Sequence, residues 1–319
     1  MTVVTTAQDL SVLIVTYNSR PFIDACLEAL LCTVQRHTFE VLVLDNDSQD
    51  GTAEHVRRAW PSVRVVQIGS NAGFAAANNV GVTLSAGRHV LLLNGDAVVE
   101  DDAVDILVET LDQDPRVGVA APQVLNPDRS DQGTARRFPT PAAALWGRRS
   151  PLTRAFPRVR YAQRYLSGLA HIHDVEPYDV DWVSGACMMM PRSVVEKVGG
   201  LDAGFFMHWE DADLCRRIKG AGHVVRVSPT ARVVHSEGGS RRGWPPKQVA
   251  HFHRGAYRYY SKHHLQGVRV AGRPLAAVVL MARALLVMAV QSPARFRPRA
   301  EENRKSTRRQ LLTSRGDAG

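Results

Sequence analysis

The sequence predicts an α/β protein with a mostly parallel sheet flanked by helices, and three observations lead to this prediction. Short apolar runs alternate with amphipathic segments of helical length from residue 10 to residue 125. The connections between them are short and rich in Asn, Asp, Ser and Gly. Residues 90–93 form a continuous apolar run ended by a turn, which is typical of a strand buried on both faces. Such alternation favours βαβ units and therefore parallel strands.

In this N-terminal half, apolar runs predict five strands and polar turns predict the helices between them. The expected strands are residues 10–15, 39–44, 63–68, 90–93 and 117–121. The expected helices begin near Pro21 and near Thr52, and cover about 75–85 and 101–113. Asn18 or Ser19 is expected to cap the first helix, with Pro21 in its first turn.

The C-terminal half has a different pattern. Residues 126–178 are rich in Arg, Pro and Gly, and we expect long irregular connections with short helices there. Further strands are expected at 181–190, 224–227 and 232–235. Helices are expected at 191–198, closed by Gly199 and Gly200, in the second part of 205–220, and at 245–264.

Composition limits the classes of partner. The 319 residues carry a net charge of +9, from 35 Arg and 5 Lys against 31 acidic residues. A basic chain fits nucleic acid, an anionic membrane surface or phosphorylated ligands. Nucleic-acid binding needs basic residues interleaved with aromatic ones, whereas the Arg-rich stretches lie mostly outside the motif-bearing half, so we expect no nucleic-acid partner. The four cysteines have no metal-ligand spacing and predict free thiols, and no signal-peptide pattern begins the chain, so we expect a cytoplasmic protein.

The central strand ends in Asn94-Gly95-Asp96, which places a carboxylate at its carboxyl end. Ligands of open α/β sheets bind at that edge. A carboxylate there can hold a hard cation, and the cation can hold phosphate. The alternative is an acidic turn in solvent, which is common.

Three other turns at expected strand ends carry candidate ligand contacts. A planar base could rest on the ring of Tyr17, and a carboxylate at Asp45 could accept hydrogen bonds from ribose. Gly73 allows close backbone approach, and Asn78 lies one helical turn beyond Phe74, so the two can share a face. Helix caps and Asx turns are the structural alternatives for all three turns.

The C-terminal half offers two further candidates. Glu210, Asp211 and Asp213 enter a helix, where acidic residues also favour the helix dipole. The bulky apolar residues 205–207 precede them, and a carboxylate beside such a wall can have its pKa raised and act as a general base. His235 ends a short strand and could bind a metal or cap a turn.

Taken in order, these motifs resemble the family 2 glycosyltransferases of the GT-A fold, and most closely the rhamnosyltransferase-like branch. The resemblance covers about residues 10–260. The matching segments are LIVTYN at 13–18, VLDNDSQDGT at 43–52, NAGFAAANN at 71–79, LLLNGDAVV at 91–99, the long run from VSGACMMM to GAGH at 183–223, and VVHSEGG at 233–239.

The resemblance implies roles for individual residues. The nucleotide-sugar site would comprise Thr16, Tyr17, Asn18, Asp45, Asp47, Gly73, Phe74, Asn78, Asn94 and Asp96. Asp96 and His235 would hold Mg²⁺ or Mn²⁺, Asp211 would be the catalytic base, and Trp209, Glu210 and Asp213 would lie on the acceptor side. Asn94 stands where the family's DxD motif has its first aspartate, and an amide is a poorer cation ligand than a carboxylate.

The implied reaction is an inverting transfer from a nucleoside-diphosphate sugar, best guessed as rhamnose from dTDP-rhamnose, to a cell-envelope polysaccharide or polyprenyl-linked acceptor. Three alternatives stay open: an inactive nucleotide-sugar-binding relative, a basic nucleic-acid-binding protein and a nucleotidyltransferase. The last usually has a Gly-rich loop followed by Arg and Lys, where this chain has residues 16–19, TYNS.

The division expected from these patterns is a catalytic domain at 1–264, with a nucleotide-sugar half at about 10–125 and an acceptor half at about 126–264, followed by a helix and basic tail at 265–319.

Residues 275–290 would span about 24 Å, less than the roughly 30 Å of a bilayer core. Arg283 interrupts them, Arg273 precedes them, and Arg295, Arg297 and Arg299 follow. We expect an interfacial helix on the anionic inner leaflet of the plasma membrane, with its arginines at the headgroups. The alternative is packing on the catalytic domain or in a homodimer, and the tail beyond 296 is expected to be disordered.

Overall fold

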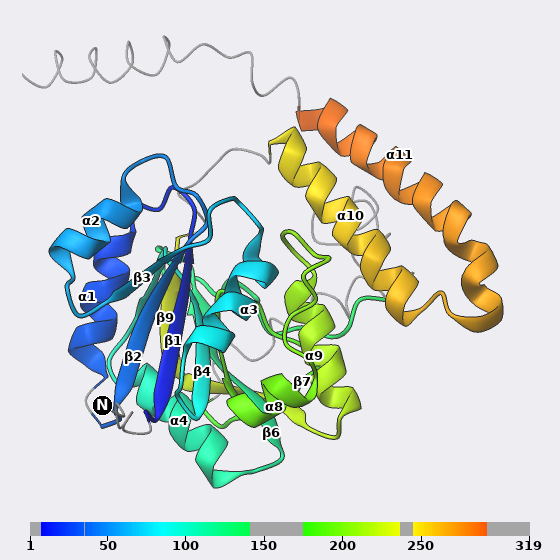
Figure 1. Ribbon diagram of the computed structural model, residues 1–319. Coiled ribbons are helices and arrows are strands. Elements are labelled where there is room, and N and C mark those ends of the chain that lie inside the picture. The colour runs from blue at the N-terminus through cyan, green and yellow to red at the C-terminus, as the bar shows by residue number, and fades with distance from the viewer. Residues whose placement is uncertain (1–7, 35, 141–174, 237–244, 292–319) are drawn as a thin grey trace, which may run out of the picture.

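The computed structural model describes residues 8–34, 36–140, 175–236 and 245–291. Within them, one nine-stranded sheet forms the centre, with helices on both faces (Figure 1). The strands are β1 (Leu10–Thr16), β2 (Phe39–Asp45), β3 (Arg64–Gln67), β4 (His89–Asn94), β5 (Ala97–Val99), β6 (Val117–Leu125), β7 (Tyr178–Val180), β8 (Cys187–Pro191) and β9 (Val224–His235). The predicted α/β class, with a central sheet flanked by helices, is confirmed.

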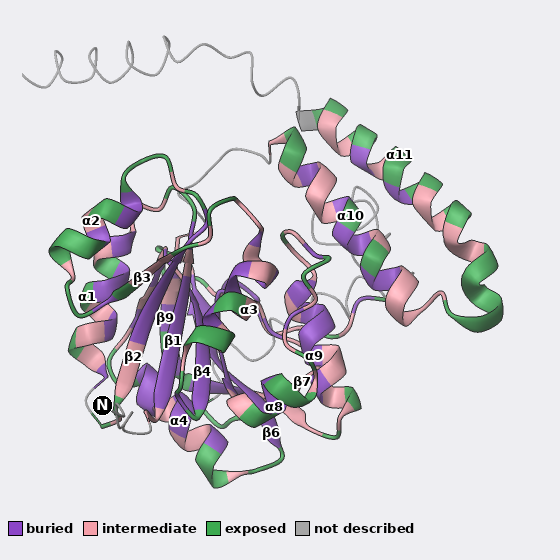
Figure 2. Cartoon of the chain, viewed as in Figure 1, coloured by how far each residue is buried: buried purple, intermediate pink, exposed green. Residues whose placement is uncertain are grey.

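Two hydrophobic clusters lie on opposite faces of the sheet. Helices α1 (Ile23–Thr33), α2 (Thr52–Ala59) and α4 (Ala103–Gln113) contribute to one cluster. Helices α3 (Phe74–Leu84), α8 (Arg192–Lys197) and α9 (Glu210–Gly220) contribute to the other. Strand β4 supplies Leu91 and Leu93 to the first cluster and Val90 and Leu92 to the second, so it is buried on both faces as predicted (Figure 2).

The strand order is β3-β2-β1-β4-β8-β6-β9-β5, and β7 pairs with β9. The pairs β2–β3, β1–β2 and β1–β4 are parallel, as the βαβ pattern predicts. Beyond β4, β8 pairs antiparallel with both β4 and β6, and β9 pairs antiparallel with β5 and β7, so the sheet as a whole is mixed and not mostly parallel as predicted. The register aligns Thr16 with Asp45 and Val15 with Asn94, so the polar strand ends meet at one edge of the sheet.

Four local predictions differ from the structure. Phe22 is the N-cap residue of α1 and no side chain caps it, because Asn18 adopts a left-handed backbone (φ 55°) and bonds the β2–α2 loop instead. The two short strands expected at 224–235 are one strand, since a register shift against β6 absorbs the predicted break. Strand β8 begins only at Cys187, because residue Trp182 bridges to Arg136 instead of joining the sheet. Strand β5, right after the Asn94-Gly95-Asp96 turn, was not expected.

Three elements complete the described chain: α10 (Pro246–His263), the short 3₁₀ helix η2 (Gly267–Gly272) and α11 (Arg273–Gln291). Helices α10 and α11 form a hairpin beside the sheet (Figure 1). A third cluster, which includes Phe205, Ala212, Tyr259 and Leu280, joins the hairpin to α9. Residues 267–290 are long and apolar enough to cross a membrane by length and composition alone. Short helices were predicted within 126–178; residues 141–174 of this stretch and the tail beyond 296 lie outside the described residues, and the described part of the stretch has no helix. The four cysteines form no disulfide with one another, and Cys32 is exposed.

Candidate functional site

The ends of β1 and β2 form the first wall of the candidate site. Thr16 Oγ1 donates to Asp45 Oδ1 at 3.2 Å, and Asp45 Oδ2 accepts the backbone N–H of Ser48 at 3.1 Å. Thr16 and Asp45 are buried, whereas the Tyr17 side chain is 52% exposed and offers a ring face at the rim. Asp47 is also exposed and has a left-handed backbone (φ 67°). The first two predicted motifs therefore lie together, with Tyr17 and Asp47 open to solvent.

The start of α3 forms the second wall. Gly73 has φ 88°, and a Cβ there would lie 2.4 Å from the carbonyl oxygen of Phe206, so only glycine fits. The next residue, Phe74, donates its N–H to that same carbonyl at 3.0 Å. This contact brings the loop before α9 onto the predicted nucleotide-sugar motif.

Two asparagines fix the α3 motif from inside. Asn46 accepts the N–H of Ala72 and donates to the carbonyl of Gly73, so it ties the end of β2 to the start of α3. Asn78 is buried and donates to the carbonyl of Phe74 at 3.0 Å. Its Oδ1 has no hydrogen-bond partner among the described residues. Asn46 was absent from the predicted site, because its role depends on backbone groups far away in the sequence.

The central triplet and His235 meet at the same edge of the sheet. Strand β5 pairs antiparallel with the end of β9, which sets Ala97 opposite His235. His235 Nε2 consequently lies 3.2 Å from Asp96 Oδ1 and 3.1 Å from Asn94 Nδ2. The two residues predicted to bind a metal are therefore neighbours.

Gln132 holds His235 from the opposite side. Gln132 Nε2 donates to the carbonyl oxygen of His235 at 2.7 Å, which turns its Oε1 toward the ring, 2.9 Å from Nδ1. With an acceptor facing Nδ1, the proton belongs on Nδ1 and the lone pair of Nε2 faces Asp96. Sequence reasoning missed Gln132, since it lies in a stretch expected to be irregular.

The separation of Asp96 and His235 equals that of an ordinary ion pair and also that of two ligands on one divalent cation. Adjacent ligands of an octahedral Mg²⁺, each about 2.1 Å from the ion, lie about 3 Å apart. The 3.2 Å between Asp96 Oδ1 and His235 Nε2 matches this separation. In the described part of the chain, no three or more His, Cys, Asp or Glu side chains are grouped to hold a metal. The set here is thus one carboxylate and one imidazole, because Asn94 turns its amide nitrogen, a donor, toward His235.

The start of α9 presents the predicted base. His208 and Trp209 both have left-handed backbones, with φ 68° and 76°, which costs roughly 1–3 kcal/mol per residue. Helix α9 begins directly after them at Glu210. Asp211 Oδ2 accepts the N–H of Gly185 at 3.2 Å and its Oδ1 accepts the N–H of Ala212 at 2.7 Å. The carboxylate is thereby held in one orientation.

Burial raises the pKa of Asp211, and the two N–H donors and the charge of Arg136 offset this only in part. Burial also raises the pKa of Glu210, and the negative charge of Asp211 adds to the rise. Glu210 Oε2 has no hydrogen-bond partner within the described ranges. A carboxylate whose pKa is raised toward neutrality is a better proton acceptor, which suits Asp211 to the predicted role.

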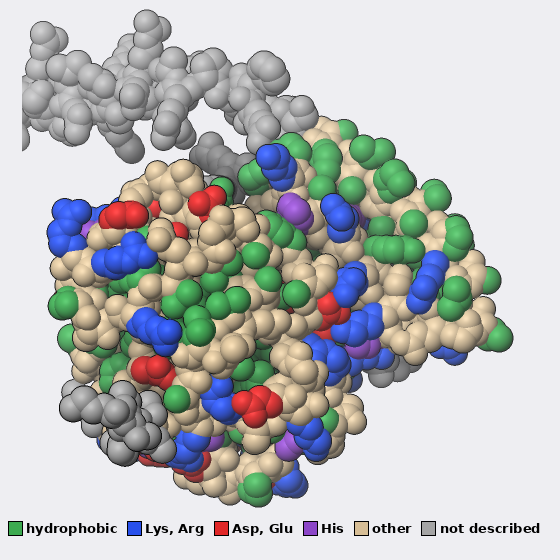
Figure 3. Space-filling view, in the orientation of Figure 1, with side chains coloured by type: hydrophobic (Ala, Val, Ile, Leu, Met, Phe, Trp, Pro, Cys, Tyr) green, Lys and Arg blue, Asp and Glu red, His purple; other side chains and the backbone are tan. Residues whose placement is uncertain are grey.

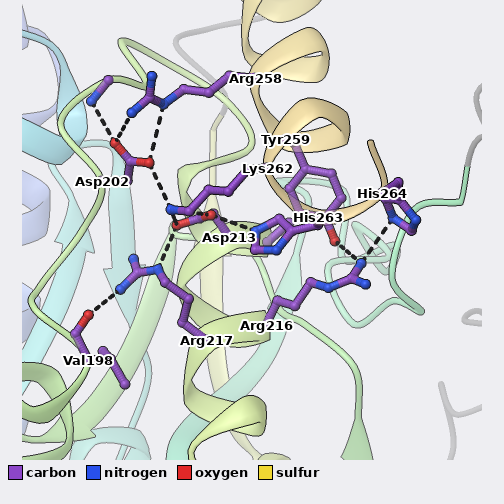
Figure 4. A network of polar contacts seen from close by, with 12 residues as sticks. Val198, Asp202, Asp213, Arg216, Arg217, Arg258, Tyr259, Lys262, His263 and His264 are labelled. Carbon is purple, nitrogen blue, oxygen red and sulfur yellow. Dashed lines mark hydrogen bonds and ion pairs between the residues drawn. The ribbon is translucent and has the colours of Figure 1, made fainter. Parts of the chain in front are cut away.

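Asp213 and Trp209 face α10. Asp213 is fully buried and contacts Arg217, Lys262 and His263 at 2.7–2.8 Å (Figure 4). Burial alone would raise the pKa of Asp213, but these three partners together lower it. The Trp209 ring packs on the rings of Phe252, Tyr259 and Tyr260. The structure therefore separates Asp213 from Asp211 and places it between α9 and α10.

Two consecutive residues join the two halves of the site. The carbonyl oxygen of Ala186 accepts the N–H of Asn94 at 2.9 Å, and the N–H of Gly185 binds Asp211. The ring of Phe74 also packs over Gly185, where a Cβ would lie 3.2 Å from it. The two residues just before β8 thus contact the Asn94-Gly95-Asp96 triplet, the α3 motif and the predicted base. Gly185 lies in the matching segment 183–223, but no sequence pattern assigned it a role of its own.

Comparisons with known proteins show which family the chain resembles. A family model described as "Glycosyltransferase like family 2" matches residues 7–257. The chain is 30% identical over 268 residues to N-acetylglucosaminyl-diphospho-decaprenol L-rhamnosyltransferase of Mycobacterium tuberculosis, covering 80% of this chain and 85% of the relative.

Two solved structures have a similar fold. The first is the mannosyltransferase PcManGT from Pyrobaculum calidifontis in complex with GDP-Man and Mn²⁺, with a TM-score of 0.56, 19% identity, and coverage of 97% of this chain and 81% of that one. The second is GalNAc-T7 with UDP, GalNAc and Mn²⁺, with a TM-score of 0.58 and 18% identity. That match covers 81% of this chain and about half, 51%, of the solved one.

Proposed function

The chain belongs to glycosyltransferase-like family 2 and has the GT-A fold, and from that premise we propose that it is an inverting enzyme. It transfers a sugar from a nucleoside-diphosphate donor to a lipid-linked or polysaccharide acceptor of the cell envelope. The observation that supports this proposal is that two consecutive residues contact the candidate base and the triplet: the N–H of Gly185 donates to Asp211, and the carbonyl oxygen of Ala186 accepts the N–H of Asn94. Both halves of a transfer reaction then share one edge of the sheet.

The proposed donor site is the aligned set of strand ends and the start of α3. Asp45 accepts hydrogen bonds from the nucleoside, and Tyr17 stacks on its base. The remaining donor contacts come from Thr16, Asn18, Asp47, Gly73, Phe74, Asn78, Asn94 and Asp96. The best candidate donor is dTDP-rhamnose, supported by the name of the mycobacterial rhamnosyltransferase at 30% identity.

Asp96 and His235 would hold Mg²⁺ or Mn²⁺, which when bound supplies positive charge to the leaving diphosphate. Gln132 keeps the Nε2 lone pair of His235 turned toward Asp96. Asn94 supplies no second carboxylate, and its amide nitrogen lies 3.1 Å from Nε2 of His235. Support for a divalent ion comes from the ligand spacing and from the Mn²⁺ in both solved structures of similar fold.

On the acceptor side, Asp211 takes the proton of the attacking hydroxyl. The hydroxyl oxygen bonds to the anomeric carbon from the face opposite the diphosphate, while the bond from that carbon to the diphosphate oxygen breaks. A single displacement inverts the configuration and needs no covalent enzyme intermediate. We assign Trp209 and Glu210 to the acceptor wall, and Asp213 acts there by fixing α10 against α9.

We further propose that the protein is cytoplasmic and peripheral on the inner face of the plasma membrane, with residues 1–264 as the catalytic domain and 265–319 as the membrane-directed part. The name of the mycobacterial relative contains a decaprenol lipid, which supports a polyprenyl-linked acceptor. The exposed apolar helix α11 supports a membrane surface as partner over a homodimer.

The second candidate function is nucleotide-sugar binding without transfer, and Asn94 in place of a carboxylate favours it. Single-turnover transfer from dTDP-rhamnose to a polyprenyl-linked acceptor, with the product anomer assigned by NMR, separates the two. The proposal expects a product of inverted configuration. Tight nucleotide binding with no transfer from any of a panel of donors would support the binding relative instead.

A further inference from the structure

Helix α11 turns an apolar face outward. Its large exposed side chains recur at spacings of three and four residues, so they form one stripe along the helix. They are Leu275, Val278, Val279, Met281, Leu285, Leu286 and Val290, each between 46% and 70% exposed. Figure 3 shows hydrophobic side chains gathered over this helix. The opposite face, with Leu280 and Ala284, is buried in the hairpin.

The two arginines of α11 turn inward, toward α10. Arg283 Nη1 lies 2.9 Å from His253 Nε2, whose Nδ1 is 2.7 Å from the carbonyl oxygen of Val249. Arg273 donates to the carbonyl oxygens of Leu265 and Ser261, both at 3.2 Å. The expectation that Arg273 and Arg283 reach lipid headgroups is therefore wrong, because both contact α10 or the turn after it. Arg295, Arg297 and Arg299, for which the same was expected, lie outside the described residues.

We infer that the outer stripe of α11 is buried in the acyl-chain side of a bilayer interface, and that apolar contact, rather than headgroup charge, binds the protein there. This deepens the peripheral location proposed above and rests on it. The 19 residues of α11 span about 28 Å, close to a bilayer core of about 30 Å, so length alone does not decide how the helix meets the membrane. Its partner α10 carries Arg, Lys and His along its length and stays on the water side, so the hairpin lies on the membrane.

A second copy of the chain is a poorer occupant for this stripe. A strip about 24 Å long and 10 Å wide falls well below the roughly 800 Å² per partner of a stable interface. The stripe also presents no exposed charged residue of α11 that could fix the register of two packed helices. Burial among acyl chains needs no minimum interface area and no fixed register. It needs only an apolar surface that loses contact with water.

The hairpin is rigidly joined to the catalytic helix. Lys262 and His263 of α10 both contact Asp213 of α9, and Lys262 also contacts Asp202 in the loop before it (Figure 4). Asp211 precedes Asp213 by two residues. A membrane bound at α11 therefore lies in a fixed orientation to Asp211, as transfer to a lipid-linked acceptor requires.

Flotation with vesicles tests this directly and needs no transfer activity. The full chain should float with neutral phosphatidylcholine vesicles as well as with anionic ones, and should stay bound in 1 M NaCl, because apolar burial is not screened. The double variant Leu285→Ser, Leu286→Ser should lower the vesicle partition coefficient about a hundredfold. Each leucine buried in the bilayer contributes about tenfold to that coefficient. Leu84→Ser, at an exposed leucine on α3, is the matched control and should bind like the parent.

Circular dichroism and nucleoside-diphosphate affinity show whether the double variant is folded. Binding only to anionic vesicles, with release in salt, would overturn the inference. So would a dimer, seen by light scattering, that the double substitution converts to monomer. Vesicle binding without any sugar transfer would leave the inference standing and contradict only the proposed function.

Discussion

His235 Nε2 lies 3.2 Å from Asp96 Oδ1, across the antiparallel pair of β9 and β5. The contact joins the last residue of β9 to a carboxylate in the turn between β4 and β5. Because Asn94 replaces the second carboxylate of the usual motif, Asp96 carries the only negative charge of the triplet.

Asp96→Ala should therefore abolish the effect of Mn²⁺ on nucleoside-diphosphate affinity, while Asn94→Asp should tighten Mn²⁺ binding by adding a charged ligand. Calorimetry with and without Mn²⁺ measures both changes. Asp102→Asn, at an exposed carboxylate outside the site, is the control. If neither variant alters the Mn²⁺ dependence, this triplet is not the metal site.

Gln132 should act on metal affinity without touching the metal. Gln132→Leu removes both hydrogen bonds that orient His235, and loss of such a supporting contact typically costs 10- to 100-fold in metal affinity. Titration of Mn²⁺ by electron paramagnetic resonance detects the change independently of catalysis. Unchanged Mn²⁺ affinity would show that the ring orientation does not depend on Gln132.

Asp45 should contribute to nucleotide binding. Asp45→Ala leaves Thr16 Oγ1 and the N–H of Ser48 without their acceptor and removes the proposed contact to the nucleoside. We expect nucleoside-diphosphate binding to weaken by about 1–3 kcal/mol. Glu54→Gln, an exposed substitution on α2, should leave affinity unchanged. Equal affinities of parent and Asp45→Ala by calorimetry would remove Asp45 from the site.

Asp213 should stabilise the fold in a pH-dependent manner. Asp213→Asn leaves Arg217, Lys262 and His263 without their carboxylate partner and should lower the free energy of unfolding by about 3 kcal/mol. Because the pKa of Asp213 is lowered from 3.8, its contribution is complete above that pH and is lost as the pH falls through the folded value. Urea unfolding at pH 7 and pH 3 should show the cost shrinking in acid.

The control for that comparison is Glu196→Gln, which removes an exposed carboxylate 4.0 Å from Arg192 and should change stability by less than about 1 kcal/mol. A cost for Asp213→Asn no larger than that of Glu196→Gln would mean that the buried contacts between α9 and α10 contribute little to stability.

Much of the N-terminal half was predictable because its signals are local. The composition of an apolar run such as 90–93 is enough to predict that both faces of its strand are buried. Each polar turn directly follows its strand in the sequence. The direction of β8 was not predictable, since nothing in its residues Met188–Met190 encodes which neighbour it pairs with.

The missed parts of the site depend on contacts between distant segments. Gln132 is 103 residues from His235, and Gly185 acts through a backbone N–H that every residue except proline possesses. Arg283 points inward because it contacts His253, which lies 30 residues earlier on another helix. The sequence alone does not show this contact, so Arg283 was predicted to reach lipid headgroups.

Single-turnover sugar transfer with Asp211→Asn shows whether Asp211 is the base of a transfer reaction. This change keeps the side-chain volume but removes the proton acceptor, so the rate should fall by roughly 10²–10⁴ while donor affinity stays the same. Glu210→Gln is the matched control beside it and should lose much less. Near-normal transfer by Asp211→Asn would exclude Asp211 as the base and point to Glu210 instead.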